Sequence, residues 1–408
     1  MSNTSTGSMR ATKKLIPDLR FLEFVKDGEW VKEEFGDLLD YLQPTDYLVT
    51  STAYDGKYKT PVLTAGKTFI LGYTNEREGV FKNNLPVIIF DDFTTASKYV
   101  DFPFKAKSSA MKILMAKKNG NIKFFFESMQ NINYEVGVHG RHWISIFSKL
   151  KVPIPQPKEQ QKIASCLSSL DELIAAHNNK LKTLKDHKKG LMQNLFPATS
   201  TGSATGETVP KYRFPEFEND GEWVKKKLGD EDVSFFVTSK IDSQTLNLQN
   251  YFSTDNMLSD FGGITKATKL PSTGRVTKCI KGDILISNIR PYLKKIWKSD
   301  RQGGTSNDVL VFRSGIKVIS DFLECIIKND AFINYVMLSA KGVKMPRGDK
   351  DSMMEYSIRM PDQKEQQKIA SCLSALDDLI TSQTEKIEQL KQHKKGLMQG
   401  LFPKIEVA

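Results

Sequence analysis

The feature of this sequence that most constrains its fold is a long internal repeat. Residues 158–197 read KEQQKIASCLSSLDELIAAHNNKLKTLKDHKKGLMQNLFP, and residues 364–403 repeat them with about 28 of 40 positions identical. A shorter pair precedes these copies, RFLEFVKDGEWVK at 20–32 and RFPEFENDGEWVK at 213–225. The segments between the pairs show no such likeness. The chain is therefore expected to build one frame twice and to carry two different inserts on it.

Each copy of the longer repeat predicts one long helix. Apolar side chains recur at alternating spacings of four and three residues, from Ile163 to Leu195 and again from Ile369 to Leu401, which is the heptad pattern of a coiled coil. Prolines lie just before and just after the two runs: Pro157, Pro197, Pro361 and Pro403. Because proline is tolerated at a helix start and stops a helix further on, each helix should have about 35 residues and a length of roughly 50 Å.

A helix with so narrow an apolar stripe needs a partner, and the other copy is an equal partner within the same chain. If a pseudo-twofold axis relates the two halves, the helices run antiparallel, and His177 and Gln383 meet near the middle of the seam. Packing of each helix on its own insert, or against a second chain, is the alternative. Gly190 and Gly396 each cost about 1 kcal/mol relative to alanine inside a helix. Both copies keep them, which a closely approaching partner chain would explain.

The two inserts are large enough to fold as separate globules. The first contains β-rich runs at 58–74, 85–94 and 121–128, and the second has expected buried strands at 279–287 and 308–312. The predicted fold class is therefore α+β. It consists of two α/β globular domains joined by two long antiparallel coiled-coil helices in a pseudo-twofold arrangement.

Charge and composition bound the function. The sequence has 59 Lys and Arg against 48 Asp and Glu, a net charge of +11, which favours a polyanionic partner such as nucleic acid, although basic surfaces also serve solubility alone. No long uncharged apolar run and no signal-peptide pattern is present, so a cytoplasmic protein without a membrane span is expected. The four cysteines are far apart and predict neither disulfides nor a zinc site.

One segment of the second insert stands out, the basic and aromatic stretch 288–307 between the two expected strands. Its cations Arg290, Lys294, Lys295, Lys298 and Arg301 lie beside Tyr292 and Trp297. Loops of this composition contact phosphates and base edges. The alternative is a solvated surface loop whose two aromatic side chains fill the core.

The search for catalytic chemistry yields absences. The AGKT at 65–68 resembles the end of a phosphate-binding loop, but Pro61 stands where the earlier glycine is required. There is no Asn-Pro-Pro-aromatic tetrapeptide, no glycine-rich turn after a strand for a methyl donor, and no glutamate followed two residues later by lysine. His139 and His142 form the one close histidine pair, without carboxylate or thiol partners at ligand spacing. No catalytic residue and no metal site is predicted.

Taken together, these motifs resemble the DNA specificity subunits of type I restriction-modification systems. The resemblance covers about residues 20–403 and is carried by the duplicated RFxEF…DGEWVK starts, the KEQQKIA helix starts and the HKKGLMQxLFP helix ends. The stretches YKTPVLTAGKTFILGYT, FDDFTTASKYVDFPFKAKSSAMKIL, GDILISNIRPYLKK and SNDVLVF in the inserts also carry it. The N-terminal tail with its STGS and lysine pair is not covered.

The resemblance implies two target-recognition domains, each reading one half of an asymmetric bipartite site in double-stranded DNA, held at a fixed distance by two antiparallel helices. It implies two modification subunits that carry S-adenosylmethionine and methylate adenine, and restriction or translocase subunits that use ATP and Mg²⁺. This chain would then hold no cofactor. The resulting division is an N-terminal tail 1–19, first target-recognition domain 20–157, first spacer helix 158–197, flexible linker 198–212, second target-recognition domain 213–363, second spacer helix 364–403 and C-terminal tail 404–408.

On this interpretation Arg290 is the first candidate for DNA contact, because an arginine forked onto a guanine contributes about 1–3 kcal/mol of discrimination. The candidates in the second domain are Asn288, Arg290, Lys294, Lys295, Lys298 and Arg301. The candidates for phosphate contact in the first domain are Lys67, Arg77, Lys98 and Lys105. The candidates for the modification-subunit interface lie toward the helix ends: Lys188, Lys189, Gly190, Lys394, Lys395 and Gly396.

Two other interpretations stay open. One is a fused restriction or methylation enzyme with a divergent active site, which would modify or cut DNA without partner subunits. The other is a coiled-coil scaffold without a role on DNA, whose interactions with nucleic acid would show no dependence on salt.

Overall fold

The computed structural model describes residues 14–66, 68–117, 120–132, 141–197, 207–271 and 274–404. Lys67, His139, most of the N-terminal tail, most of the linker and the last four residues therefore lie outside the described residues. The chain forms two compact units, unit 1 from Met1–Asn178 with Glu385–Ala408, and unit 2 from Asn179–Thr384. These boundaries cut across both long helices, so each unit contains a part of each helix instead of leaving the helices as separate spacers.

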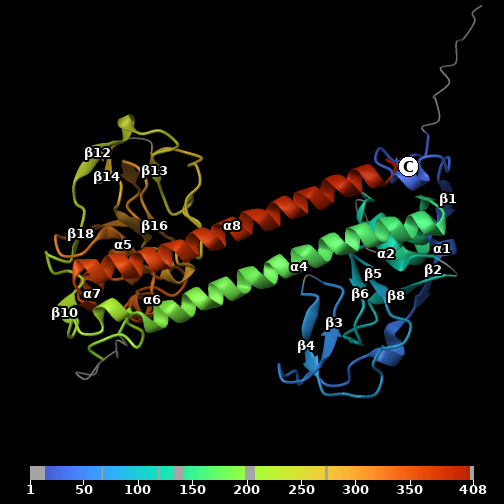
Figure 1. The fold of residues 1–408 in the computed structure, drawn as a ribbon, viewed down its shortest axis with the longest axis horizontal. Coiled ribbons are helices and arrows are strands. Elements are labelled where there is room, and N and C mark those ends of the chain that lie inside the picture. The colour runs from blue at the N-terminus through green and yellow to red at the C-terminus, as the bar shows by residue number, and fades with distance from the viewer. Residues whose placement is uncertain are drawn as a thin grey trace, which may run out of the picture. The chain divides into compact units, whose positions relative to one another are not determined.

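Two helices are much longer than the others, α4 from Pro157–Asn194 with 38 residues and α8 from Gln363–Leu401 with 39 residues (Figure 1). Both predicted long helices are confirmed. Helix α4 starts on the proline itself, whereas α8 is capped by Asp362, whose side-chain oxygen accepts bonds of 2.9 Å from the N–H groups of Lys364 and Glu365.

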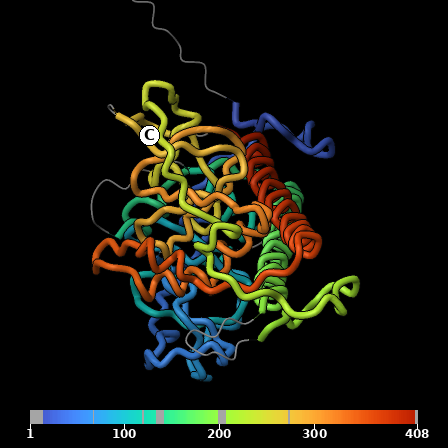
Figure 2. The backbone as a smooth tube through the Cα atoms, turned by 90° about the vertical axis from the view of Figure 1, so that its left-hand side faces the viewer, coloured from blue at the N-terminus to red at the C-terminus, as the bar shows by residue number. Residues whose placement is uncertain are grey.

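Within each unit the two helix segments run antiparallel, side by side (Figure 2). In unit 1 Leu397 and Leu401 pack with the core that includes Ile163 and Leu167, and one turn back along α8 Lys394 pairs with Asp171 at 2.7 Å. Residue numbers thus rise along α4 as they fall along α8.

Unit 2 repeats this arrangement at the other ends of the helices. There Lys188 pairs with Asp377 at 2.5 Å, and Leu195 lies in one core with Ile369 and Leu373. The predicted contact of His177 with Gln383 would join the two units and stays a prediction.

The insert of unit 1 builds two small sheets around a buried central strand. Every residue of that strand, β5, is buried, as expected for a strand covered on both faces. The antiparallel sheet has the order β2 (Leu39–Leu42), β8 (Met111–Ala116), β5 (Val87–Asp91), β6 (Ser97–Val100), and the second sheet β4 (Ile70–Thr74), β3 (Thr60–Leu63), β7 (Lys105–Ala106). Helix α2 (Ile122–Gln130) covers the first sheet, and β1 (Val31–Glu34) pairs with β9 (Lys151–Ile154).

The insert of unit 2 has the same kind of framework with different additions. One sheet has the order β11 (Ser234–Phe236), β18 (Val309–Ser314), β15 (Ile284–Ser287), β16 (Ile296–Lys298), and the other β12 (Lys240–Asp242), β14 (Arg275–Cys279), β17 (Gly303–Thr305), β13 (Tyr251–Phe252). Strand β10 (Val224–Lys227) pairs with β19 (Ser357–Met360), and the helices are α5 (Ser320–Lys328), α6 (Asp330–Leu338) and α7 (Lys350–Met354).

Two expectations about local structure were wrong. The β-rich run 121–128 is helix α2, because Asn121 caps it by accepting a bond of 3.0 Å from the N–H of Phe124, and its buried aromatic side chains suit a helix as well as a strand. The stretch 288–307 is not one loop, because β16 and β17 lie within it and Trp297 pairs across to Leu285.

The frame makes the same contacts in both units. In unit 1 the guanidinium of Arg20 donates two hydrogen bonds to the carboxylate of Glu159 at 2.8 and 2.7 Å, and a third to the carbonyl oxygen of Gly28 at 2.6 Å. In unit 2 Arg213 donates to the carboxylate of Glu365 at 2.9 and 2.7 Å and to the carbonyl oxygen of Gly221 at 2.6 Å. Each short repeat is thus clamped onto the start of its own long helix.

The end of each long helix packs in the unit that the other half of the chain begins. Trp30 lies against Phe402 from the end of α8, with the rings at 82°. Trp223 lies against Phe196 from the end of α4, with the rings at 87°. Neither unit's core is complete without a helix end from the other half.

Candidate nucleic-acid interface

Three loops meet at one end of the sheet formed by β15 and β18 in unit 2. They comprise residues 288–295, 306–308 and 341–348, and are called the loop cluster below. The N–H of Asn288 donates to the carbonyl of Asp308 at 2.8 Å, and the N–H of Arg290 donates to the carbonyl of Pro346 at 2.8 Å. The main chain therefore fixes these loops against one another.

Arg290 has an uncommon backbone and an uncommitted side chain. Its φ of 51° and ψ of 62° lie in the left-handed region, which costs about 1–2 kcal/mol for a residue with a side chain. Within the part of the chain that the structure describes, its Nε atom is buried without a hydrogen-bond partner and its guanidinium makes no ion pair. Strain of this kind gathers at functional sites, and here it holds a cation that the fold leaves unpaired.

Two neighbouring polar atoms share this lack of partners among the described residues, Asn288 Oδ1 and Ser306 Oγ. Asn288 follows directly on β15, and its oxygen lies near Gly348, where an added Cβ would come within 3.0 Å of it. Buried polar atoms are rarely left unsatisfied. Three such atoms in one loop cluster make it the strongest candidate site for a polar ligand.

Two of the other predicted cations are paired inside unit 2. Lys294 forms an ion pair with Asp330 at 2.6 Å, and Lys298 pairs with Asp321 and with Glu324, the latter at 3.2 Å. Burial opposes the charge of Lys298, but hydrogen bonding to Asp321 and attraction by Glu324 outweigh burial and raise its pKa. Their charges are largely neutralised by the fold.

The remaining two are also occupied. Lys295 donates to the carbonyl oxygen of Thr254 at 2.6 Å, and Arg301 lies 3.2 Å from Asp300 and above the ring of Trp297 at 5.8 Å. A contact of these residues with DNA stays a prediction. Arg290 alone among the six predicted residues combines a positive charge with no partner in the described structure.

The sequence analysis missed the third loop of the cluster. Arg347 lies opposite Ile289 in an isolated β-bridge, and its guanidinium pairs with Asp308 at 2.8 Å. The stretch KGVKMPRGDK at 341–350 combines four cations with two glycines and a proline. Basic residues also led to the prediction of a DNA-contacting loop at 288–307, so the same criterion could have identified this loop.

The predicted phosphate contacts of unit 1 are divided by the structure. Arg77 and Lys98 are exposed, whereas Lys105 is only 3 % exposed and pairs with Glu76 at 2.7 Å. Burial raises the pKa of Glu76, but the bonds from Lys105 and from the N–H of Ser51 outweigh it and lower this pKa to about 2. A phosphate contact does not fit the placement of Lys105, because its buried ammonium already forms an ion pair with Glu76.

The residues predicted for the subunit interface also fall into two groups. Lys188 and Lys394 are used in the ion pairs between the helix segments. Lys189 and Lys395 are exposed, and an added Cβ at Gly190 or Gly396 would meet no atom within 4 Å. Packing within the chain therefore does not require these glycines.

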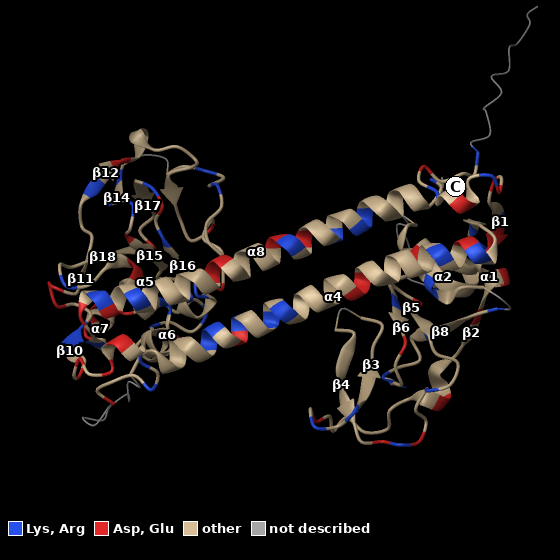
Figure 3. Ribbon diagram, viewed as in Figure 1, with Lys and Arg blue, Asp and Glu red and all other residues tan. Residues whose placement is uncertain are grey.

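Two exposed leucines on the same helices were missed. Leu173 is 44 % exposed and Leu379 is 54 % exposed, and they occupy equivalent positions of the repeat. Basic residues accompany them along both helices and are also spread over the loops of both inserts (Figure 3). Both copies thus have a leucine at a position where about half of its surface stays in contact with solvent.

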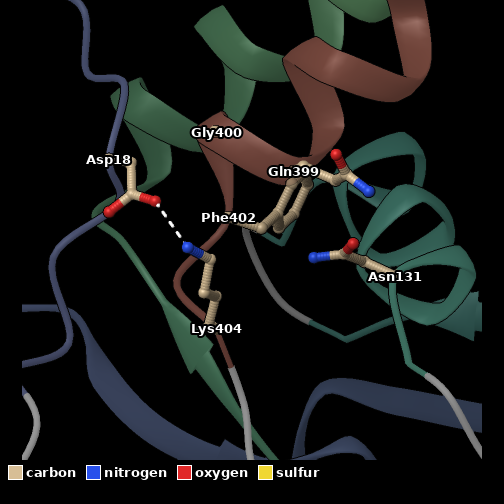
Figure 4. A pocket seen from close by; sticks show the side chains of 6 residues that line it. All are labelled: Asp18, Asn131, Gln399, Gly400, Phe402 and Lys404. Carbon is tan, nitrogen blue, oxygen red and sulfur yellow. Dashed lines mark ion pairs between the residues drawn. The ribbon is translucent and has the colours of Figure 1, made fainter. Parts of the chain in front are cut away.

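Each unit also has a hollow beside the end of a long helix. In unit 1 it measures ≈ 540 Å³ and is lined by Asn131, Gln399 and Phe402, with an ion pair of 3.1 Å between Asp18 and Lys404 at its edge (Figure 4). In unit 2 a hollow of ≈ 330 Å³ is lined by residues that include the matching Gln193, Phe196 and Asn329. Both belong to the repeated frame.

The described residues include neither a candidate metal cluster nor a membrane-spanning helix. Across its ranges no three His, Cys, Asp or Glu side chains gather as a metal site would require. Within the same ranges no helix is both long and apolar enough to cross a membrane. All four cysteines are unbridged.

Comparison with known proteins agrees with this geometry. Residues 27–186 and 240–392 match the type I restriction modification DNA specificity domain. The type I restriction enzyme EcoR124I/EcoR124II specificity subunit of Escherichia coli is 44 % identical over 167 residues, 39 % of this chain and 41 % of that protein. The MjaVIII specificity subunit of Methanocaldococcus jannaschii is 26 % identical over 277 residues, 63 % of this chain and 62 % of that protein. The chain thus spans less than two thirds of the length of either relative.

A solved structure shares the fold over almost the whole chain. The crystal structure of the S subunit of a type I restriction-modification system from M. genitalium covers 96 % of this chain and is itself covered completely, with a TM-score of 0.61 and 14 % sequence identity. The predicted α+β fold with two domains is confirmed by this likeness. With most of its length matching the specificity domain, in two copies, the chain belongs to the type I restriction modification DNA specificity family.

Proposed function

We propose that this chain is the DNA specificity subunit of a type I restriction-modification complex. It binds an asymmetric two-part site in double-stranded DNA, one half per insert, and directs adenine-N6 methylation and restriction by partner subunits. The observation that carries the proposal is a frame repeated contact by contact, from Arg20–Glu159 to Arg213–Glu365, around two inserts that differ. A repeated frame can present two units to two half-sites along the major groove of one duplex, while unlike inserts make the half-sites unlike.

The difference between the inserts extends to equivalent positions. Asp92 follows β5 as Asn288 follows β15, and each donates its N–H to the carbonyl of the residue just before the neighbouring strand, Ala110 and Asp308. Two residues further on, unit 1 has Thr94 where unit 2 has Arg290. The carboxylate of Asp92 is buried and held by Lys112 at 3.4 Å and by the N–H of Trp143 at 2.9 Å. Unit 1 therefore offers the hydroxyl of Thr94 where unit 2 offers a guanidinium, and the two groups read different base edges. The two units are therefore suited to different bases.

The partners follow from the repeat as well. Leu173 and Leu379, Lys189 and Lys395 keep their identity at exposed positions of the two helices. An exposed surface that occurs twice suits two copies of one partner, here two modification subunits. Those subunits would supply S-adenosylmethionine and the methyl transfer. Restriction or translocase subunits would supply ATP and Mg²⁺, leaving this chain non-catalytic.

The test is a genome-wide map of N6-methyladenine in cells that carry the modification subunit, with and without this chain. The expected result is an asymmetric two-part motif, methylated on both strands, only when the chain is present. The same map without the chain would contradict the proposal. Methylation or cleavage of DNA by the purified chain alone, with cofactors added, would instead support a fused enzyme.

A further inference from the structure

The third loop of the cluster is closed at its base and apolar at its tip. Lys341 and Arg347 exchange two backbone hydrogen bonds of 2.9 Å, so the five residues between them project as one short finger. Gly342 has a φ of +98°, a conformation that favours glycine and lets the chain reverse. At the tip Val343 is 104 % exposed and Met345 is 48 % exposed.

This finger, residues 341–347, is held where the candidate DNA-binding residue lies. The carbonyl of Pro346, at its base, accepts the N–H of Arg290 at 2.8 Å, and Arg347 reaches Asp308 at 2.8 Å. Lys341 pairs with Asp349 at 2.7 Å outside the finger. The base of the finger is therefore fixed while its tip stays bare.

Exposed apolar side chains cost free energy in water unless they find a partner. Lys344 lies between the two apolar residues of the tip in the chain, and Lys341 and Arg347 lie together at the base of the finger. A partner of high negative charge with an apolar interior fits this pattern, and stacked base pairs between phosphate backbones have both properties. Proteins that kink DNA insert Met, Leu, Ile or Pro side chains between base steps in this way.

We infer that Val343 and Met345 form a wedge that enters a base step beside the bases contacted by Arg290, and that this bends the DNA of the second half-site. The inference rests on the proposed function, because it assumes that unit 2 binds DNA. It adds a deformation to the contacts, so that the second half-site is selected partly by how easily it bends.

The test uses the full chain assembled with its modification subunits and a DNA duplex that contains the motif identified by the methylation map. Fluorophores at both ends of the duplex report its bending. The variant is Val343→Ser with Met345→Ser. The matched control is Ile316→Ser, an equally bare apolar side chain of unit 2 at 84 % exposure that lies outside the loop cluster. Both variants alter only surface side chains, and thermal unfolding checks that they fold alike.

The double variant should lose most of the bend and bind the motif about tenfold more weakly. Its salt dependence should equal that of the wild type, because the cations of the finger remain. The control should bend and bind as the wild type does. A double variant with unchanged bend and affinity would overturn the wedge, and so would one that binds DNA normally but loses a modification subunit. Failure of the wild-type complex to prefer the motif would instead overturn the proposed function.

Discussion

Arg290 shows how one residue can be singled out from a group with the same charge. Its neighbours Lys294 and Lys298 point to carboxylates of their own unit, whereas Arg290 is held by its backbone alone. The planar guanidinium of Arg290 is rigid in itself, so that little conformational entropy is lost per hydrogen bond formed, which favours a forked contact.

Replacing Arg290 with lysine should therefore remove base discrimination more than charge. Binding to the motif should weaken by about 1–3 kcal/mol, and tolerance should widen at one position of the second half-site only. Competition binding against duplexes substituted at each position measures both effects. Arg275→Lys, at an exposed position of β14, is the control. Equal weakening across all sequences would mean that Arg290 contacts a phosphate.

Residue type and local composition were sufficient to predict Arg290 as a candidate. They were insufficient for Lys105, because its partner Glu76 lies 29 positions away and the pair forms only when β7 closes its sheet. Such long-range pairing determines whether a surface-type residue is available to a ligand, and no short pattern encodes it.

At the scale of elements, α4 and α8 each have a packed face and an exposed face. Their seam residues, with the pairs Lys188–Asp377 and Lys394–Asp171, join the helix segments within each unit. Their heptads and bounding prolines predicted both helices well. Helix α2 was harder to predict, because the short buried run Lys123–Phe125 fits either a strand or a helix, and the cap by Asn121 favours the helix.

The exposed faces of these helices give the second prediction. Leu379→Glu should abolish docking of one modification subunit and leave the other in place, since burying a carboxylate without a partner is costly. Native mass spectrometry of the assembled complex should then show one modification subunit per chain. Leu173→Glu should do the same for the other copy, and both changes together should leave none. Retention of two subunits in the doubly substituted chain would exclude this surface as the interface.

At the scale of the whole molecule, the repeat predicted that one framework is used twice, and the clamps of Arg20 and Arg213 bear this out. The sequence did not predict that each helix end completes the other half's unit. Each helix end could pack in either of two nearly identical frames, and the sequence of the repeat does not distinguish between them.

Exchange of inserts follows as the third prediction. A chain whose residues 226–363 are replaced by the corresponding insert of another member of the family should direct the modification subunits to methylate a new motif. Only one half of the motif should change. The other half and the number of base pairs between the halves should stay the same, because the frame is unchanged. The same methylation map reads out the result. A change in both halves would show that the units do not read DNA independently.

The repeated frame, with its clamps and helix ends, also determines how genes of this kind can recombine. Because the gene carries nearly the same stretch on either side of its second insert, crossing over between two such genes within those stretches would transfer the whole insert and leave every joint of the recipient intact. A lineage could in this way acquire a new target sequence for methylation in one event, without passing through intermediates that fold poorly.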